Sequence, residues 1–389
     1  MTGTASDLKA RLTELALAQG FPLVRFAPAA PLLEARAAAE ERREAGHFAG
    51  MHWMTAEWVE RATDPGRFLE DARTVMVVAL PYPSRSERPP GGRPRGQIAR
   101  YARGRDYHRV FEKKLRKIVR AIREELGGQA RATVDYGPLL ERPLAAVSGL
   151  GWQGKSTMLL VPGFGPWVLL GAIATDLAVA PDPPLRKSCG SCTRCIVACP
   201  TGAISPEGGV VDARRCISYH TIENRGPIPR ELRASFGNWI FGCDECLTAC
   251  PVGRGEIEGY ADFAPRSVDD AEPELAPLLA LTEEEFRERY QGRPILRAKR
   301  DGFVRNVCVA LGNVGSAEDM PALTAALEDV SPLVRGHAAW ALGRLFERGV
   351  IEPEQAAWAE AALQTRGELE QDAFAREEME AALRLLRGM

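Results

Sequence analysis

The sequence contains no apolar run of about 18 residues, so no segment is expected to span a membrane. Its start, Met1–Gln19, lacks the features of a secretory signal and has no twin-arginine motif. The formal net charge of −2 is close to zero, so no overall field points to a charged partner. These absences favour a cytoplasmic protein. In that reducing compartment, clustered cysteines are more often metal ligands than disulfides.

The composition, 45% hydrophobic and 26% charged, is that of a globular chain long enough for two or three domains. Residues 1–180 mix helical patterns with short apolar runs and predict an α/β domain. The expected strands are Phe21–Ala27, Thr74–Leu80, Ala132–Asp135 and Trp167–Ala174, and the expected helices include Met1–Gln19 and Tyr107–Gly127. Residues 83–96 are rich in Pro, Gly and Arg and predict an exposed loop.

The rest of the chain divides into two further expected domains. Residues 181–265 hold eight of the nine cysteines with little periodicity, which predicts a small domain that depends on metal centres. Residues 275–389 are helical by pattern, and two Ala-Leu-Gly triplets, at Ala310–Gly312 and Ala341–Gly343, lie 31 residues apart. This repetition is similar to HEAT repeats, with a plain helical bundle as the alternative.

The cysteines form two runs that match bacterial ferredoxins. The first, Cys189–Pro200, has the spacing C-x2-C-x2-C-x3-C-P, which binds 4Fe–4S clusters. The second, Cys243–Pro251, ends in the same way but lacks one cysteine, and Cys216 is the remaining local candidate. Structural zinc is the alternative, because paired C-x2-C motifs also suit tetrahedral zinc. Two such endings with eight cysteines favour the clusters.

The crossover of the ferredoxin pattern assigns the eight ligands. The first cluster takes Cys189, Cys192, Cys195 and Cys250, and the second takes Cys199, Cys216, Cys243 and Cys246. The ninth cysteine, Cys308, lies on an apolar helix face and is expected to be a core residue. A spacer of 26 residues separates Cys216 from Cys243, and we expect it to cover the second cluster or to line a site beside it.

Two further segments carry candidate chemistry. Asp135 ends an expected strand before a Gly-Pro turn, so it either faces a cleft or caps the turn. The Gly149–Thr157 segment formally contains a P-loop string, but residues 144–148 before it predict a helix rather than a strand. Nucleotide hydrolysis is therefore not favoured. The backbone amides and Lys155 suit phosphate or amide groups of another cofactor.

Taken in order, these motifs resemble the epoxyqueuosine reductase family over nearly the whole chain. They are Asp135-x-Gly-Pro-x-x-Glu-Arg142, Gly149-Leu-Gly-Trp-x-Gly-Lys-Ser156, Cys189–Pro200, Cys216-Ile-Ser-Tyr-x-Thr-Ile-Glu223 and Cys243–Pro251, with Arg100-Tyr-Ala-x-Gly-x-Asp106-Tyr-His108 as a further match. The resemblance implies an α/β cobalamin-binding domain, a ferredoxin-like domain with two 4Fe–4S clusters and a HEAT-like helical domain. It also implies a two-electron reduction of epoxyqueuosine to queuosine at the wobble position of tRNA. An external donor would supply the electrons.

The resemblance also implies residue roles. Asp135 is the proton donor to the epoxide oxygen, and its pKa would have to be raised by a desolvated site for it to be protonated near neutral pH. Tyr107 helps to position the base, with a core tyrosine as the alternative. The cobalamin contacts are Arg61, Asp135, Arg142, Gln153, Lys155, Ser156, Leu159 and Ser218.

Basic residues cluster in two places along a nearly neutral chain. Arg85–Arg123 holds 14 Lys and Arg against three acidic residues, and Arg293–Arg305 holds five against one. Such runs are often only solvated faces, but with tRNA as the implied substrate we expect phosphate contacts. Lys299, Arg300 and Arg305 are expected to grip the stem.

Two other functions fit part of the sequence. One is a cobalamin and iron–sulfur reductase of small molecules, similar to reductive dehalogenases. The lack of an export signal, the basic runs and the helical tail argue against it. The other is a ferredoxin-type carrier without a substrate, against which the large N-terminal domain argues. We expect a monomer.

Overall fold

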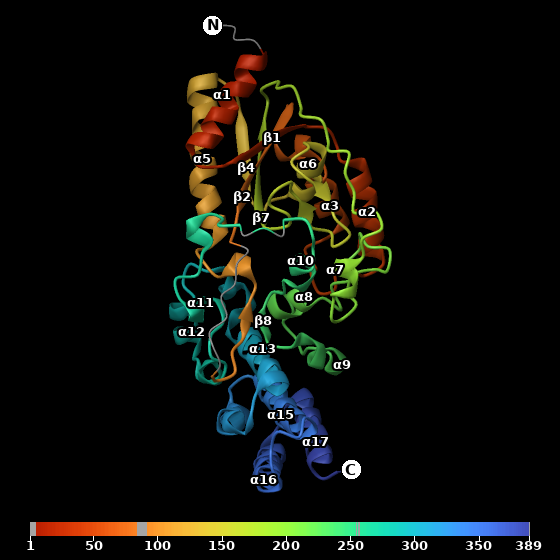
Figure 1. The fold of residues 1–389 in the computed structure, drawn as a ribbon, viewed down its shortest axis with the longest axis vertical. Coiled ribbons are helices and arrows are strands. Elements are labelled where there is room, and N and C mark those ends of the chain that lie inside the picture. The colour runs from red at the N-terminus through yellow and green to blue at the C-terminus, as the bar shows by residue number, and fades with distance from the viewer. Residues whose placement is uncertain (1–4, 84–91, 254, 256, 389) are drawn as a thin grey trace. The chain divides into compact units, whose positions relative to one another are not determined.

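The computed structural model describes residues 5–83, 92–253, 255 and 257–388 (Figure 1). It divides into two compact units: residues 1–85, 105–214 and 245–264 form the first, and residues 86–104, 215–244 and 265–389 form the second. The segment expected as a middle domain, residues 181–265, contributes to both units, and the three-domain boundaries stay a prediction. Most of the expected loop at residues 83–96, namely 84–91, lies outside the described residues.

A four-stranded antiparallel sheet forms the centre of the first unit. Its strands are β1 (Leu23–Pro28), β2 (Thr74–Pro81), β4 (Ala130–Thr133) and β7 (Val168–Thr175), in the order β1-β2-β7-β4. The four expected strands are therefore confirmed, each with ends shifted by one or two residues. The α/β character of the N-terminal region is confirmed with them. Asp135, expected at a strand end, lies two residues beyond β4.

Helices cover both faces of this sheet, which is why β2 is buried along almost its whole length. Helices α1 (Ala5–Ala18) and α5 (Tyr107–Leu126) lie on one face, and α6 (Glu141–Val147) lies on the other (Figure 1). A Cβ at Gly171 of β7 would lie 2.8 Å from the Phe111 ring, so this glycine lets α5 approach the sheet closely. Asp106 caps the start of α5 through the His108 amide, and Gly127, at φ +67°, ends it.

The remaining elements of the first unit are short. They are α2 (Leu33–Glu44), α3 (Ala56–Ala62), α4 (Pro65–Phe68), the hairpin of β5 (Trp152–Gln153) and β6 (Leu159–Leu160), α7 (Arg194–Val197) and α10 (Glu245–Thr248). Because α6 precedes the glycine-rich segment where a P-loop would need a strand, the nucleotide-hydrolysis interpretation lacks its structural context.

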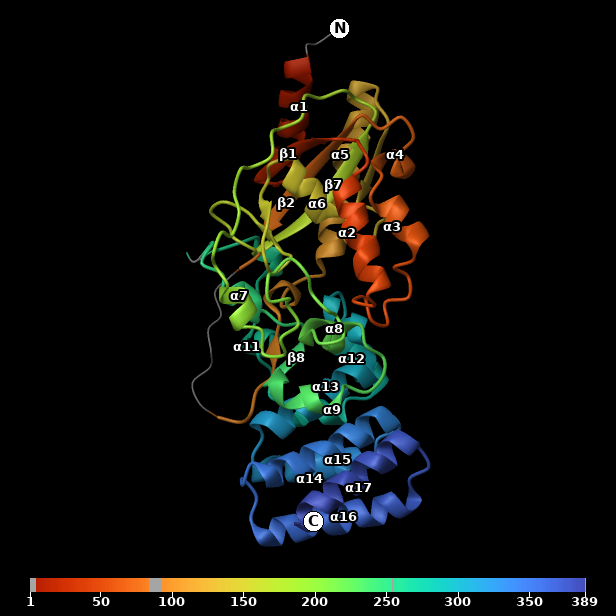
Figure 2. The same cartoon turned by 90° about the vertical axis from the view of Figure 1, so that its right-hand side faces the viewer.

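The second unit is mainly helical. Its elements are β3 (Gln97–Ile98), paired in parallel with β8 (Trp239–Phe241), and helices α8 (Ile217–Ile222), α9 (Arg230–Arg233), α11 (Val268–Ala271), α12 (Glu283–Arg289), α13 (Lys299–Val314), α14 (Met320–Ala325), α15 (Pro332–Glu347), α16 (Pro353–Leu369) and α17 (Ala373–Leu386). Figure 2 shows α14 to α17 stacked beside one another. Cys308 is fully buried in this core, which confirms its predicted role, and burial raises the pKa of its thiol.

The spacer between Cys216 and Cys243 folds as α8, α9 and β8 and packs on α13. Arg305 of α13, 1% exposed, donates hydrogen bonds to the carbonyl oxygens of Asn224 and Gly226, at 3.0 and 2.6 Å. Its neighbour Asn306 donates to the carbonyl oxygens of Thr221 and Ile240, both at 2.9 Å. These buried bonds hold the spacer against the helical core.

This arrangement corrects the expectation that Arg300 and Arg305 grip RNA. Burial lowers the pKa of Arg305 to about 9, and its donors are used by the spacer. Arg300 is 7% exposed and forms a two-pronged ion pair with Asp329, one arm of which measures 2.7 Å. Both residues are structural.

In the part of the chain that the structure describes, no helix is long and apolar enough to cross a bilayer.

Candidate active site

The loop after β4 holds Asp135 in a restricted conformation. Its φ of +50° lies in the left-handed region, which costs a non-glycine residue roughly 1 kcal/mol or more. One hydrogen bond and one steric constraint in the turn fix this conformation. The Asp135 N–H donates to Glu141 Oε1 at 2.5 Å, and a Cβ at Gly137 would overlap Thr133 Oγ1 at 1.4 Å, so the turn needs glycine. The loop therefore presents the Asp135 carboxylate in a defined direction.

The first turn of α5 supplies the partners of this carboxylate. Asp135 Oδ2 accepts a hydrogen bond from the Tyr107 hydroxyl at 2.7 Å and lies 3.2 Å from His108 Nε2. The other ring nitrogen, His108 Nδ1, lies 2.7 Å from Asp106 Oδ1. Each imidazole nitrogen therefore faces a carboxylate, an arrangement that favours the imidazolium, in which both nitrogens donate.

The electrostatics of the site follow from these contacts. Burial acts to lower the pKa of His108, but the hydrogen bonds and charges of Asp106 and Asp135 outweigh it and raise the pKa to about 9. Partial desolvation by the surrounding protein acts to raise the pKa of Asp135, but His108, Tyr107 and the Arg142 charge lower it below its ordinary value. Burial, with the Asp135 charge, raises the pKa of Glu141 to about 8.

The expectation that Asp135 has a raised pKa is therefore wrong. In this geometry the exchangeable proton of the pair resides on His108, and Asp135 is the ionised partner. His108 and Glu141 are the site residues that sequence reasoning missed. Both lie within motifs that are visible in the sequence. Their contacts with Asp135 depend on how α5 and α6 pack against the sheet, so the sequence gives no signal for their roles.

The structure brings three of the sequence-predicted residues together: Asp135, Tyr107 and Arg142. Tyr107 is 7% exposed, but its hydroxyl reaches the site, so it is both a core residue and a partner of Asp135. Arg61 is exposed at the end of α3, where the Ala62 carbonyl accepts a hydrogen bond from the Leu140 N–H at 2.9 Å. This bond ties α3 to the loop that carries Asp135.

Four other predicted contacts lie in or near the β5–β6 hairpin, in which Gln153 pairs with Leu159. Gln153 is exposed, Ser156 is 6% exposed, and the Leu159 side chain is buried in the hydrophobic cluster beneath α6. The Lys155 carbonyl accepts a hydrogen bond from the Gly209 N–H at 2.7 Å, which fixes the turn. Ser218 lies in α8 of the second unit. The ligand roles of these residues stay a prediction.

The cysteines of the first predicted ligand set gather in the first unit. Burial raises the pKa of the Cys195 thiol, and so do the nearby charges of Cys189, Cys250 and Cys192. A surface hollow is lined by residues 188–194, which include Cys189 and Cys192, and by Pro251. These positions fit the set that the ferredoxin crossover predicts. No disulfide joins any of the nine cysteines, all of which lie among the residues that the structure describes.

The four cysteines of the second predicted ligand set do not all belong to one unit. Cys199 accepts a hydrogen bond from the Ala203 N–H at 3.2 Å, whereas Cys216 and Cys243 belong to the second unit. The membership of this set stays a prediction. Among the described residues, no three His, Cys, Asp or Glu side chains converge closely enough to hold a single metal ion.

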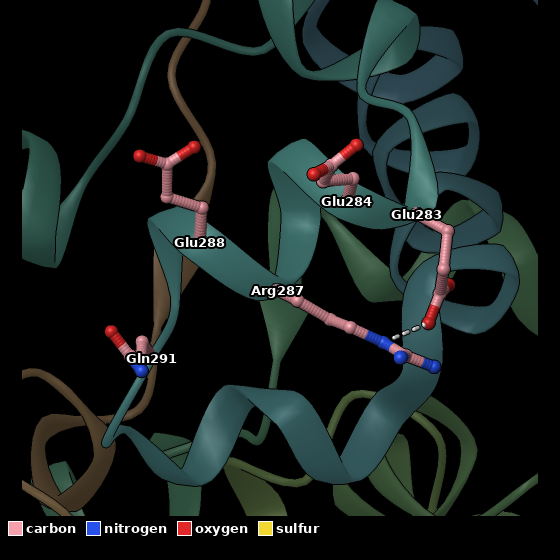
Figure 3. Close-up of a pocket in the computed structure, with 5 residues that line it drawn as sticks. All are labelled: Glu283, Glu284, Arg287, Glu288 and Gln291. Atoms are coloured by element: carbon pink, nitrogen blue, oxygen red, sulfur yellow. Dashed lines mark hydrogen bonds and ion pairs between the residues drawn. The ribbon is translucent and has the colours of Figure 1, made fainter.

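Another hollow, on α12, has no connection with this chemistry. Glu283, Glu284, Arg287, Glu288 and Gln291 line it (Figure 3). Arg287 Nε donates to Glu283 Oε1 at 2.6 Å, and none of the predicted site residues takes part. Its lining is that of a solvated helix face.

An α/β unit with a carboxylate–imidazole pair and a ferredoxin-type pattern of cysteines are the features expected of an iron–sulfur oxidoreductase. Residues 188–253 match the 4Fe-4S double cluster binding domain, which decides against zinc. Residues 62–136 match the family described as Epoxyqueuosine reductase QueG, DUF1730. The epoxyqueuosine reductase of Xanthomonas campestris pv. campestris is 41% identical over 308 residues, covering 77% of this chain and 85% of the relative. The chain belongs to the epoxyqueuosine reductase family.

Solved structures of related enzymes agree over almost the full length. An epoxyqueuosine reductase crystallised with an epoxyqueuosine-modified tRNA stem loop is 31% identical, with a TM-score of 0.90, and the match covers 99% of this chain and 100% of that one. The Bacillus subtilis enzyme, described with its catalytic aspartate loop swung out of the active site, is 30% identical, with a TM-score of 0.89 and coverage of 98% and 100%. The predicted family resemblance is confirmed, and it decides against the carrier and small-molecule interpretations.

Proposed function

We propose that this chain reduces epoxyqueuosine in tRNA to queuosine, with Asp135 as the immediate proton donor. The reaction is a two-electron reduction of an epoxide to an alkene with loss of water. The observation that carries the proposal is the His108–Asp135 pair, a proton source on a constrained loop in a chain of this family. The related Bacillus subtilis structure, described by its catalytic aspartate loop, supports the same role for Asp135.

The pair supplies a proton where the reaction needs one. The Asp135 side chain is 61% exposed, so the carboxylate that Tyr107 and His108 hold is also open to a substrate. Opening an epoxide builds negative charge on its oxygen, and a positioned acid lowers that barrier. His108 Nε2 passes its proton to the ionised Asp135 carboxylate, and Asp135 delivers it to this oxygen, so the proton stored on His108 reaches the epoxide through Asp135. Tyr107 keeps Oδ2 oriented during the exchange.

The residues around the hairpin fit cobalamin, whose amide side chains need hydrogen-bond donors. Within the described chain, Trp152 Nε1 is buried without a hydrogen-bond partner, and it lies next to Gln153 in β5. A buried donor left unpaired costs about 1–3 kcal/mol, so a ligand acceptor there would stabilise the site. The residues of the first unit that would hold the group are Arg61, Asp135, Arg142, Gln153, Lys155, Ser156 and Leu159. When bound, cobalamin would supply a low-valent cobalt centre that the two clusters recharge with single electrons.

Helix α5 is the proposed contact for the tRNA backbone. It begins at Tyr107 and His108 and carries one exposed basic stripe leading away from the site, made of Arg109, Lys113, Arg116, Lys117, Arg120 and Arg123. Neutralising phosphates in this way gives affinity that falls steeply with salt. Beside Asp135, Tyr136 is 63% exposed and offers a ring on which an unstacked base can lie.

Only part of the predicted basic region is available for this role. Arg103 is 3% exposed and donates to the Ile98 carbonyl at 2.7 Å, and Arg100 pairs with buried Asp244 at 3.2 Å. Arg95 pairs with Asp269 at 2.8 Å. These arginines stabilise the second unit, so the proposed RNA contacts are those of α5.

We also propose that the C-terminal helices are HEAT-like. The two glycines that close the Ala-Leu-Gly triplets have the same packing role: a Cβ at Gly312 of α13 would lie 3.1 Å from Ala341 Cα of α15, and one at Gly343 of α15 would lie 3.3 Å from Ala382 Cα of α17. Equivalent residues 31 positions apart thus make equivalent close helix contacts, which is the property of a repeat.

The test is a direct conversion. The protein is loaded with iron, sulfide and cobalamin, given a chemical reductant, and mixed with tRNA that carries epoxyqueuosine. Mass spectrometry of the nucleosides should show the loss of one oxygen, and no conversion by the fully loaded protein would refute the proposal. For RNA binding, Lys113→Glu with Lys117→Glu should weaken affinity and flatten its salt dependence, whereas the exposed control Arg384→Glu should not. A salt-independent wild-type affinity would contradict the α5 contact.

A further inference from the structure

The segment that carries the first run of cysteines lies on the protein surface. Between Pro183 and Pro200, the residues around the cysteines are mostly exposed, and Val197 of α7 is 81% exposed. The hollow lined by residues 188–194 and Pro251 opens directly over Cys189 and Cys192. The ligands of the first cluster are therefore close to the solvent on this face.

This segment is also basic. It contains Arg186, Lys187 and Arg194, all exposed, and no acidic residue. Asp182, just before it, is engaged by Lys9 in a 2.6 Å ion pair. Arg194 and the exposed Pro251 line the hollow together, and the exposed Val197 ends the short helix α7 that Arg194 begins. A surface that combines exposed apolar side chains with charged ones is typical of a protein–protein interface.

The proposed reaction explains why such a surface is needed. Each epoxide consumes two electrons, and a 4Fe–4S cluster accepts them singly. The electrons must come from outside the chain, and an external carrier has to approach an exposed cluster closely and leave again. Complexes of this kind have small interfaces and short lifetimes, and complementary charge raises the rate at which they form.

We propose that Arg186, Lys187, Arg194, Val197 and Pro251 form the docking site of a small acidic one-electron carrier protein. The proposal rests on the proposed function, because the reaction creates the demand for electrons. At each encounter the carrier loses one electron and the first cluster gains one. Two encounters, with two protons, balance the reduction of one epoxide to an alkene and water.

RNA is the competing partner for a basic surface, and the observations favour the protein. The α5 stripe offers six exposed cations along one helix face, which suits a run of phosphates. The segment of the first cysteine run offers three exposed cations together with an exposed valine, and Pro251 lines the same hollow as Arg194, which suits a compact partner with an apolar contact.

The experiment uses the loaded full-length protein and a plant-type 2Fe–2S ferredoxin, a strongly acidic carrier, as the probe. Two quantities are measured: the dissociation constant at low salt, and the rate at which reduced ferredoxin reduces the clusters in stopped flow. The triple variant Arg186→Glu, Lys187→Glu, Arg194→Glu should lower both affinity and rate on the order of 100-fold. The control Arg384→Glu should leave both unchanged. Dithionite, which needs no docking, should reduce the clusters of the variant at the wild-type rate.

Three results would overturn the proposal: no binding of ferredoxin to the wild-type protein, unchanged binding by the triple variant, or a variant that loses affinity for tRNA but not for ferredoxin. If the triple variant loads iron poorly, the single variant Arg186→Glu replaces it and should lower the rate severalfold. Failure of the proposed function is seen separately, because conversion of epoxyqueuosine with dithionite does not use the docking surface.

Discussion

The proton held between His108 and Asp135 can be tested by replacing His108 with asparagine. Asparagine can still hydrogen-bond to Asp106 from the start of α5, but it cannot carry a proton to Asp135. The perturbation therefore removes the charge and keeps much of the local geometry. The exposed histidine His52, changed to asparagine, is the matched control.

The structure sets the size of the effect. The pKa of His108 rises from 6.5 to about 9, which corresponds to about 3 kcal/mol of preference for the imidazolium in the folded protein, at about 1.4 kcal/mol for each pH unit. The His108 side chain is 25% exposed, so solvent screening removes only part of this. A raised pKa stabilises the fold fully below pH 6.5, and the contribution is lost as the pH rises through about 9.

Two measurements check this reasoning. The free energy of unfolding of the wild-type protein should fall by up to about 3 kcal/mol between pH 6.5 and 9 from this group, and His108→Asn should lack that slope. At pH 7 the variant should turn over about 100-fold more slowly, the lower end of what a general acid contributes. An NMR titration of the His108 ring that gives a pKa near 6.5, or a variant with wild-type turnover, would refute the role of the pair.

Three further predictions concern single positions. Asp135→Asn should bind cofactors and tRNA normally but lose turnover by a factor of about 100 or more, and normal turnover would show that another group is the acid. Gly312→Val should lower the free energy of unfolding by about 2 kcal/mol, because the added atoms meet α15. The control Gly367→Ala has open space around it and should raise the free energy of unfolding by about 0.5–1 kcal/mol. Equal effects of the two changes would contradict the close helix contact. Cys308→Ala should leave the iron content unchanged and cost about 1 kcal/mol, and a loss of iron would contradict its core role.

The local features of this chain were predictable from the sequence. The strands of the sheet and helix α5 follow from hydrophobic periodicity, and Asp106 and Gly127 mark the ends of α5 in the expected way. The cysteine spacings predict the clusters because ligands that are two or three residues apart have little freedom to lie elsewhere. Cys308 was assigned to the core on the same local grounds.

The roles of residues that act across the fold were decided by tertiary structure. Arg300 and Arg305 read as exposed charges in the sequence, but helix packing buries both and assigns their donors to Asp329 and to the spacer. The sequence also placed the acid at Asp135, which lies 27 residues from His108. Their pKa values diverge only because α5 docks on the sheet and brings the imidazole to 3.2 Å from the carboxylate. Which of the two residues holds the proton depends on the charges around it and on their distances in space. The separation of two residues along the sequence gives neither.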